Sequence, residues 1–344
     1  MSCEGDFKSV LLGFSGGVDS VASVGLLRQR GLSVAALTLN TTGDENMLQA
    51  AMAKAAELHV EHIVKDVRCE FQHRIVDYFL SSYAAGRTPA PCTMCNPLIK
   101  WHYLISEADR LGIDAVATGH YFNVVKHDGG YYVARALDSR KDQSYYLWGL
   151  SQATLSRVIT PMGQIIKQHI NPMHSQSKES MGLCFLCGKS YGDFIRERCP
   201  SAVVVGDVIT LDGEVVGRHE GVAFYTIGQK RGLDIGATGM RVVAINAKRN
   251  ELIVGKESDL YHQTLEVGGC NLVCEDELLQ SDDVSVVVRG FGRNPEGYAQ
   301  HVERVGERYR VELEDPAWAP AIGQPVVFYR GDRVIGGGIL ERYY

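Results

Sequence analysis

Apolar and polar positions alternate in blocks through the first 120 residues of the chain. An apolar run over residues 8–14 predicts a buried strand, and apolar positions at helical spacing over residues 18–30 predict the helix that follows it. The succession then repeats, which predicts strands at 33–39, 62–67 and 115–118 and helices at 46–58, 69–85 and 98–111. Repeated strand–helix units favour an α/β fold with a doubly wound parallel sheet, whose site lies at the carboxyl ends of the strands.

The pattern changes in the second half of the chain. From about Ala202, short β-rich runs are separated by turn signals such as Asp212-Gly213 and Lys248-Arg249-Asn250, and the same texture continues beyond about Leu265. Short strands at this spacing predict a small β-rich domain followed by a C-terminal β-barrel. The mixed stretch between residues 160 and 178 is predicted to be helical and to link the two halves.

Length and composition agree with several globular domains. A chain of 344 residues is expected to form two or three domains, and its hydrophobic content of 45% provides ample core. No apolar run approaches the length of a membrane span, and the N-terminus lacks the basic and hydrophobic regions of a signal peptide. We therefore expect a cytoplasmic protein with no membrane partner. The net charge of −6 disfavours a broadly nucleic-acid-binding surface but leaves room for a local basic face.

The first predicted strand ends in the string Ser15-Gly16-Gly17-Val18-Asp19-Ser20. Its glycines allow backbone angles that expose several N–H groups together, and the start of the helix adds a positive dipole end, so the turn suits anionic oxygens. The two serine hydroxyls can donate further hydrogen bonds, and Asp19 can cap the helix or hold a magnesium ion beside phosphate. We expect the nucleotide site to comprise this string and four residues at neighbouring strand ends, namely Gly13, Leu39, Gly119 and His120.

Two interpretations of this string differ in specificity. A Gly-Gly pair alone is typical of a tight turn with a capped helix. The full string lacks the Gly-Lys-Ser/Thr of a Walker loop. It resembles the pyrophosphate loop (PP-loop) of the ATP pyrophosphatases, which share the adenine nucleotide alpha hydrolase-like fold. The resemblance implies ATP and Mg²⁺ as cofactors and cleavage of ATP into AMP and pyrophosphate.

Nine cysteines include two Cys-x-x-Cys pairs, Cys92 with Cys95 and Cys184 with Cys187, each flanked by Gly or Pro and predicted to lie in a loop. Two intervening residues let both sulfurs face one point, as in metal sites and dithiol redox sites. The pairs are compatible with structural zinc, a 4Fe–4S cluster, metal-free redox or persulfide-carrying thiols, or unrelated buried thiols. The remaining cysteines lack partner spacing and are interpreted as isolated thiols: Cys3, Cys69, Cys199, Cys270 and Cys274.

The string and the cysteine pairs together resemble the bacterial tRNA-specific 2-thiouridylases. The resemblance runs from Lys8 to about Leu340. It is carried by Ser15–Ser20, Ala85–Pro89, Cys95-Asn96, Ala117–Tyr121, Asp138–Tyr145, Gly182–Phe185, Thr226–Gly232 and Gly336–Gly338. It implies a PP-loop ATP pyrophosphatase catalytic domain at 1–165, a central linker and tRNA-binding domain with the second cysteine pair at 166–262, and a C-terminal β-barrel at 263–344.

The resemblance also implies a reaction. ATP adenylates the C2 oxygen of the wobble uridine in tRNA with release of pyrophosphate, and sulfur then displaces AMP to give 2-thiouridine. Cys184 carries the attacking persulfide, Cys95 is the partner thiol that releases sulfur or closes a disulfide, and Asp19 is the third catalytic residue. A cysteine desulfurase or a sulfur-relay protein supplies the sulfur. Because Cys92 stands where we expect Asp in the family pattern, the four paired cysteines could also bind an iron–sulfur cluster or zinc.

Further polar residues are candidates for tRNA contact, although each also fits a structural role. They are Lys141, Asp142, Gln143, Gln229, Lys230, Arg231, Arg289 and Arg293. His120 fits nucleotide contact, proton transfer or a structural hydrogen bond. Two rival functions stay open: another PP-loop adenylating ligase or amidotransferase acting on a small substrate, and a nucleotide- or metal-binding regulatory module without turnover.

Overall fold

The computed structural model describes residues 7–170, 182–235, 239–290 and 292–344. These residues form two compact units. The first comprises 7–75, 92–170 and 332–336, and the second comprises 76–91, 182–235, 239–290, 292–331 and 337–344. The chain therefore passes between the units several times.

A five-stranded parallel sheet forms the centre of the first unit, with strand order β3-β2-β1-β4-β7. Its strands are β1 (Ser9–Gly13), β2 (Ser33–Asn40), β3 (Glu61–Asp66), β4 (Ala115–Thr118) and β7 (Val158–Ile159). After β1 the chain adds β2 and β3 on one side of it and then β4 and β7 on the other side, so the order in which strands are added reverses at β1. In an open α/β sheet, this reversal leaves a crevice at the carboxyl ends of the strands.

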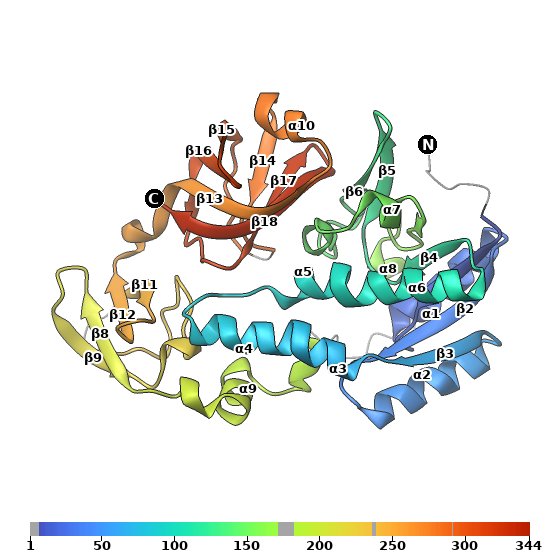
Figure 1. Ribbon diagram of the computed structural model, residues 1–344, viewed down its shortest axis with the longest axis horizontal. Coiled ribbons are helices and arrows are strands. Elements are labelled where there is room, and N and C mark those ends of the chain that lie inside the picture. The colour runs from blue at the N-terminus through green and yellow to red at the C-terminus, as the bar shows by residue number, and fades with distance from the viewer. Residues whose placement is uncertain (1–6, 171–181, 236–238, 291) are drawn as a thin grey trace. The chain divides into compact units, whose positions relative to one another are not determined.

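Helices cover both faces of this sheet. On one face, α1 (Val18–Gln29) and α2 (Glu45–Glu57) bury Val24, Leu27, Ala51 and Ala55 against alternate strand residues, and Figure 1 shows α2 alongside β3. On the other face, α6 (Trp101–Leu111) packs on β1 and β4. The predicted doubly wound parallel sheet is thus confirmed, with parallel strands at the centre and helices on both faces.

The first unit is completed by short elements. They are α3 (Arg68–Phe71), the π-helix η1 (Gln72–Val76), α5 (Pro91–Cys95), the π-helix η2 (Asn96–Lys100), the hairpin β5 (Asn123–His127) and β6 (Gly130–Ala134), the 3-10 turn η3 (Ser144–Leu147), α7 (Gln152–Leu155) and α8 (Lys167–Ile170). The loop predicted around Cys92 and Cys95 is wrong, because Pro91 occupies the first turn of a helix, where its missing N–H costs nothing. Of the helical stretch predicted up to residue 178, α8 is described and 171–178 lie outside the described residues.

The second unit contains two β-sheets. The five-stranded sheet has the order β10-β9-β8-β12-β11, from β8 (Gly206–Thr210), β9 (Val215–His219), β10 (Asp234–Ile235), β11 (Arg241–Asn246) and β12 (Glu251–Gly255). The other has the order β14-β17-β18-β13-β16-β15, from β13 (Tyr261–Leu272), β14 (Val284–Val287), β15 (Ala299–Val305), β16 (Arg308–Trp318), β17 (Pro325–Arg330) and β18 (Arg333–Tyr343). A bridge between Ser285 and Tyr298 joins the ends of this order and closes the predicted barrel.

The second unit also contains the helices α4 (Asp77–Ala84), α9 (Tyr191–Arg198) and α10 (Glu275–Gln280), and aromatic rings anchor the first two of these. The ring of Phe79 on α4 lies 5.1 Å from that of Phe185 and 6.2 Å from that of Phe194. The rings of Tyr83 and Tyr191 stack at 5.4 Å. Such edge and stacked contacts add to the apolar area they bury and so fix α9 against α4.

Candidate functional site

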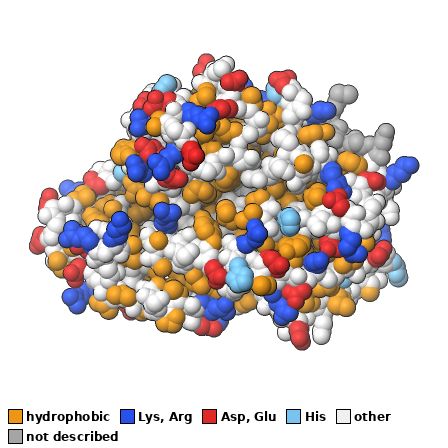
Figure 2. Space-filling model, in the orientation of Figure 1, with side chains coloured by type: hydrophobic (Ala, Val, Ile, Leu, Met, Phe, Trp, Pro, Cys, Tyr) orange, Lys and Arg blue, Asp and Glu red, His pale blue; other side chains and the backbone are white. Residues whose placement is uncertain are grey.

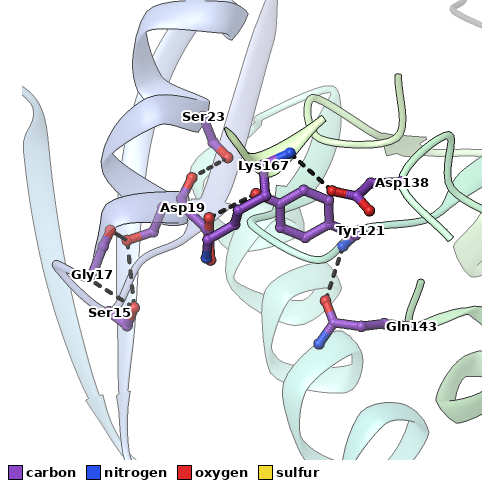
Figure 3. A network of polar contacts seen from close by, with 9 residues as sticks. Ser15, Gly17, Asp19, Ser23, Tyr121, Asp138, Gln143 and Lys167 are labelled. Carbon is purple, nitrogen blue, oxygen red and sulfur yellow. Dashed lines mark hydrogen bonds and ion pairs between the residues drawn. The ribbon is translucent and has the colours of Figure 1, made fainter. Parts of the chain in front are cut away.

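The Ser15–Ser20 string forms a tight turn between β1 and α1. Gly16 adopts φ +73°, and a Cβ at this position would lie 3.0 Å from the Cα of Ala51 on α2, so only glycine fits there without strain. The Ser15 Oγ accepts a hydrogen bond from the Gly17 N–H at 3.3 Å, and the Ser20 hydroxyl donates to the Gly17 carbonyl at 2.9 Å (Figure 3). No side chain caps the start of α1 at Gly17. The turn thus presents a helix N-terminus suited to an anion.

Neighbouring strand ends surround this turn. Gly13 at the end of β1 pairs with Leu37 on β2 and with Thr118 on β4. Gly119 follows β4, and a Cβ there would lie 3.1 Å from the Ser20 nitrogen, so its lack of a side chain lets the strand end approach the turn. Leu39 lies on β2 two residues beyond the position paired with Gly13. The structure therefore gathers Gly13 and Gly119 at the turn.

Asp19 does not cap the helix, because it lies inside the first turn of α1 rather than before it. Its Oδ1 accepts a hydrogen bond from the Tyr121 hydroxyl at 2.9 Å, and its Oδ2 pairs with the Lys167 ammonium at 2.8 Å. Figure 3 shows Tyr121 and Lys167 reaching Asp19 from segments outside α1. The capping alternative for Asp19 is therefore wrong, and its carboxylate is instead bound by Tyr121 and Lys167 beside the Ser15–Ser20 turn.

A hydrogen-bonded support holds Lys167 and Tyr121. The Lys167 N–H donates to Asp138 Oδ2 at 3.0 Å, and the Lys167 ammonium lies 5.7 Å from the centre of the Tyr121 ring. The Tyr121 N–H donates to Gln143 Oε1 at 2.9 Å, while the Gln143 N–H donates to the Tyr121 carbonyl at 2.8 Å. Gln143, which we expected at tRNA, thus has a structural bond beside the site.

His120 lies at the end of β4, where its Nδ1 is 2.8 Å from the Thr118 hydroxyl. Burial, with a smaller contribution from the nearby Lys100 charge, lowers the pKa of His120 to about 3. The ring is therefore neutral at physiological pH. A neutral imidazole can donate or accept one hydrogen bond, but it supplies no positive charge to a phosphate.

The cysteine pairs differ in exposure. Cys95 is buried at the end of α5, and burial raises the pKa of the Cys92 thiol, so that Cys92 is held as a neutral thiol. Cys184 and Cys187 are exposed; Cys184 begins the 3-10 turn η4 (Cys184–Leu186), and Cys187 has the left-handed conformation at φ +48°. Phe185 anchors this turn in the aromatic contacts with Phe79. An exposed thiol on an anchored turn suits covalent chemistry.

Metal binding by the cysteines was tested on the arrangement of ligands. Within the described ranges, no group of three or more Cys, His, Asp and Glu side chains is placed to hold a metal ion. Cys92 and Cys95 belong to the first unit, and Cys184 and Cys187 belong to the second. Within its own unit, neither pair is part of a metal centre among the described residues, and no step of the reaction is derived through one.

Candidate tRNA contacts fall into structural and exposed groups. Asp142 accepts hydrogen bonds from the Ala136 N–H and the Ser144 hydroxyl, which makes it part of the fold. Arg289 donates to the carbonyls of Ile227 and Ala319 at 3.0 and 2.7 Å. The other candidates are at least partly exposed: Lys141, Gln229, Lys230, Arg231 and Arg293.

Residues that the sequence analysis missed are Tyr121 and Lys167 as partners of Asp19. Tyr121 belongs to the Ala117–Tyr121 string, which gave a signal, but Lys167 lies 148 positions from Asp19 and no local pattern marks it. The first unit thus contains a turn suited to an anion and, beside this turn, the ion pair between Asp19 and Lys167.

Known protein families match this whole arrangement. The family model described as tRNA methyl transferase HUP domain matches residues 8–188, the tRNA methyl transferase PRC-barrel domain matches 192–256, and the aminomethyltransferase beta-barrel domain matches 263–340. The chain is 40% identical over 346 residues to tRNA-specific 2-thiouridylase MnmA 3 of Bacteroides fragilis strain YCH46, which covers 97% of this chain and 94% of that protein.

The chain belongs to the tRNA-specific 2-thiouridylase family. Other relatives agree, with 33% identity to the MnmA of Clostridium acetobutylicum over 97% of this chain and 99% of that protein, and 37% identity to the MnmA of Chloroflexus aurantiacus over 97% and 98%. Membership confirms the predicted resemblance and the PP-loop fold. None of the helices among the described residues is long and apolar enough to cross a membrane.

Proposed function

We propose that this chain uses ATP to convert the wobble uridine of tRNA into 2-thiouridine. The support that carries this proposal is the turn at the start of α1, with Gly16 in a conformation that needs glycine and a carboxylate, Asp19, facing it. ATP with Mg²⁺ fits this turn, because backbone N–H groups and a helix N-terminus bind phosphate and carboxylate oxygens bind magnesium. Family membership supplies tRNA as the substrate.

The proposed reaction has two steps. The C2 oxygen of the uridine attacks the α-phosphorus of ATP, and pyrophosphate leaves; the carbon so activated is then attacked by the terminal sulfur of a persulfide on Cys184, and AMP leaves. Cys95 attacks the resulting Cys184–sulfur bond, which releases 2-thiouridine and closes a disulfide between the two cysteines. Exposure of Cys184 supports its role as sulfur carrier, since a sulfur donor must reach it. A cysteine desulfurase or a sulfur-relay protein in the cytoplasm is the proposed donor.

Turn and strand-end residues are assigned in this proposal to the nucleotide, and four basic residues together with Gln229, all at least partly exposed, are assigned to tRNA. The first group comprises Gly13, Ser15, Gly16, Gly17, Val18, Asp19, Ser20, Leu39, Gly119 and His120, and the second comprises Lys141, Gln229, Lys230, Arg231 and Arg293. Figure 2 shows Lys and Arg side chains interspersed with Asp and Glu across the face in view, so the acidic net charge does not prevent local basic contacts. The domain boundaries at 165/166 and 262/263 are part of the proposal.

A direct assay tests the function. The protein is incubated with unmodified tRNA, Mg²⁺, ATP, and a cysteine desulfurase with cysteine as the source of persulfide sulfur. A thiol reductant reopens the Cys95–Cys184 disulfide between turnovers, and the nucleotides and the digested tRNA are analysed. We expect AMP, pyrophosphate and 2-thiouridine. Release of ADP in place of AMP, or the absence of 2-thiouridine from every tRNA tried, would overturn the proposal.

Sulfur transfer is proposed to proceed through thiols without a cluster. The exposure of the Cys184 thiol supports this route, because a sulfur donor can reach it directly. Anaerobic purification, followed by iron analysis and absorbance spectra, decides between the two. Iron-free protein that forms 2-thiouridine supports the thiol route, whereas thiolation that requires reconstituted iron overturns it in favour of a 4Fe–4S cluster.

A further inference from the structure

The ion pair between Asp19 and Lys167 is more sheltered than an ordinary surface pair. The Lys167 side chain is 15% exposed and that of Asp19 is 31% exposed. Both oxygens of the Asp19 carboxylate are engaged, Oδ1 by the Tyr121 hydroxyl and Oδ2 by the Lys167 ammonium. Asp19 is also the second residue of α1, so the ammonium lies beside the turn that would bind phosphate.

Binding of magnesium–ATP at this turn conflicts with the pair as it stands. Magnesium binds carboxylate oxygens at about 2.0–2.1 Å in a near-octahedral arrangement. Lys167 holds one of the two Asp19 oxygens, so a magnesium ion on that oxygen must displace the ammonium. A displaced ammonium in a sheltered site needs another anion, because burial of an unpaired charge is costly. Two anions can then receive the ammonium, namely the phosphate chain of the loaded site and the Asp138 carboxylate, which already accepts a hydrogen bond from the Lys167 N–H.

The base of the Lys167 side chain is fixed while its ammonium can change partner. The Lys167 N–H is bound to Asp138. The Tyr121 ring lies 5.7 Å from the ammonium, and the backbone of Tyr121 forms hydrogen bonds with Gln143 through both its N–H and its carbonyl. Four rotatable bonds separate this anchor from the ammonium, which is a compact charge without fixed donor directions. The anchor keeps the ammonium within reach of the turn.

We propose that Lys167 is a phosphate-binding residue whose ammonium is paired with Asp19 until the nucleotide binds. In the nucleotide-free protein its ammonium neutralises Asp19; in the loaded protein it transfers to an oxygen of the phosphate chain, where it stabilises the charge on the leaving pyrophosphate. The inference extends the proposed use of ATP at this site. It assigns Lys167 a contact with the nucleotide in addition to its contact with the protein.

Metal-free binding separates the two roles of Lys167. Binding of inorganic pyrophosphate in EDTA is measured by calorimetry for the wild type, Asp19→Asn, Lys167→Gln and the double variant. We expect Asp19→Asn to tighten binding about tenfold or more when Lys167 is present, because the released ammonium makes a charge-assisted bond to phosphate. In the Lys167→Gln background, the same Asp19→Asn change should have a clearly smaller effect. Equal gains in both backgrounds would show simple relief of repulsion and overturn the proposal.

Control variants guard against effects on folding. Lys126→Gln removes an exposed ammonium that lies 5.5 Å from the Tyr131 ring in the same unit, so it matches the loss of the cation–aromatic contact and should leave pyrophosphate binding unchanged. Should Lys167→Gln fail to fold, Lys167→Arg keeps the charge and is compared with Asp19→Asn in the same cycle. An arginine variant whose pyrophosphate affinity shows no dependence on Asp19 would count against the proposal.

Failure of this inference is distinguishable from failure of the proposed function. If the wild type forms AMP and 2-thiouridine but the cycle shows no coupling between Asp19 and Lys167, only the phosphate-binding role of Lys167 is lost. If the wild type binds neither pyrophosphate nor magnesium–ATP, the proposed use of ATP fails as well.

Discussion

Replacement of Gly16 by alanine gives the sharpest test of the phosphate-binding turn. An L-residue at φ +73° costs about 1–2 kcal/mol relative to glycine. The added Cβ would also lie 3.0 Å from the Ala51 Cα, a backbone atom that cannot move aside as a flexible side chain could. The two effects together amount to roughly 2 kcal/mol, and at 1.36 kcal/mol per factor of ten this corresponds to about 30-fold in an equilibrium constant.

The turn can relieve this strain by rotating its backbone, which points its N–H groups away from phosphate. We therefore expect Gly16→Ala to weaken binding of ATP by about 30-fold, as measured by equilibrium titration with magnesium present. Gly31→Ala is the matched control, because Gly31 has φ +79° at the other end of the same helix and a Cβ there would meet nothing within 4 Å. It should lower the free energy of unfolding by about 1 kcal/mol and leave ATP binding unchanged.

Two outcomes would refute this reasoning. Gly16→Ala that binds ATP with wild-type affinity would show that the turn does not contact the phosphates in the conformation described. Equal losses of ATP affinity in Gly16→Ala and Gly31→Ala would show a general effect of helix strain. Thermal unfolding of both variants establishes that the comparison is made between folded proteins.

Three further predictions address other residues. Cys184→Ala should abolish 2-thiouridine formation and leave ATP binding intact, whereas Cys199→Ala, which removes another thiol of the second unit, should retain activity; thiolated tRNA from Cys184→Ala would contradict the assignment. The pKa of His120 is near 3 in the folded protein and near 6.5 in the unfolded chain, so the unfolded chain binds the proton first and the free energy of unfolding falls as pH drops below about 6.5. Denaturant titrations at several pH values should show a shallower fall of this free energy for His120→Gln. An unchanged dependence on pH would refute the buried neutral ring. Arg293→Gln should weaken tRNA binding and reduce its dependence on salt by about one phosphate contact, while Arg289→Gln, which loses bonds to two backbone carbonyls, should chiefly lower the melting temperature; the reverse pattern in filter binding and thermal melts would overturn this division.

Regular periodicity made the fold accessible from the sequence. The β1–α1–β2–α2–β3 succession was predicted within a residue or two of its boundaries, because apolar runs mark the buried central strands β1 and β2 and apolar residues at helical spacing mark the helices between the strands. The Ser15–Ser20 turn was predicted for the same reason, since all of its determinants are adjacent in the chain. Local patterns therefore carried both the layer order and the position of the phosphate-binding turn.

Contacts between residues far apart in the chain could not be predicted from the sequence. The prolines around Cys92 and Cys95 predicted a loop, but proline also suits the first turn of a helix, and α5 takes that alternative. Asp19 is of a residue type that often caps helices, yet its carboxylate is bound by Tyr121 and by Lys167, which lie 102 and 148 positions away in the sequence. No periodicity relates residues so far apart, so the ion pair had to be seen in three dimensions.

The repeated passage of the chain between the two units has a consequence for synthesis. Residues 332–336 belong to the first unit, where Arg333 pairs with Ala134 and the Arg135 N–H donates to the Asp332 carbonyl. Helix α4 belongs to the second unit, and its buried Phe79 packs against Phe185, which follows about a hundred residues later in the chain. A ribosome must therefore have made nearly the whole chain before either unit is complete. Early fragments would expose apolar surface that chaperones bind, and a gene shortened before residue 332 would lack one segment of the first unit.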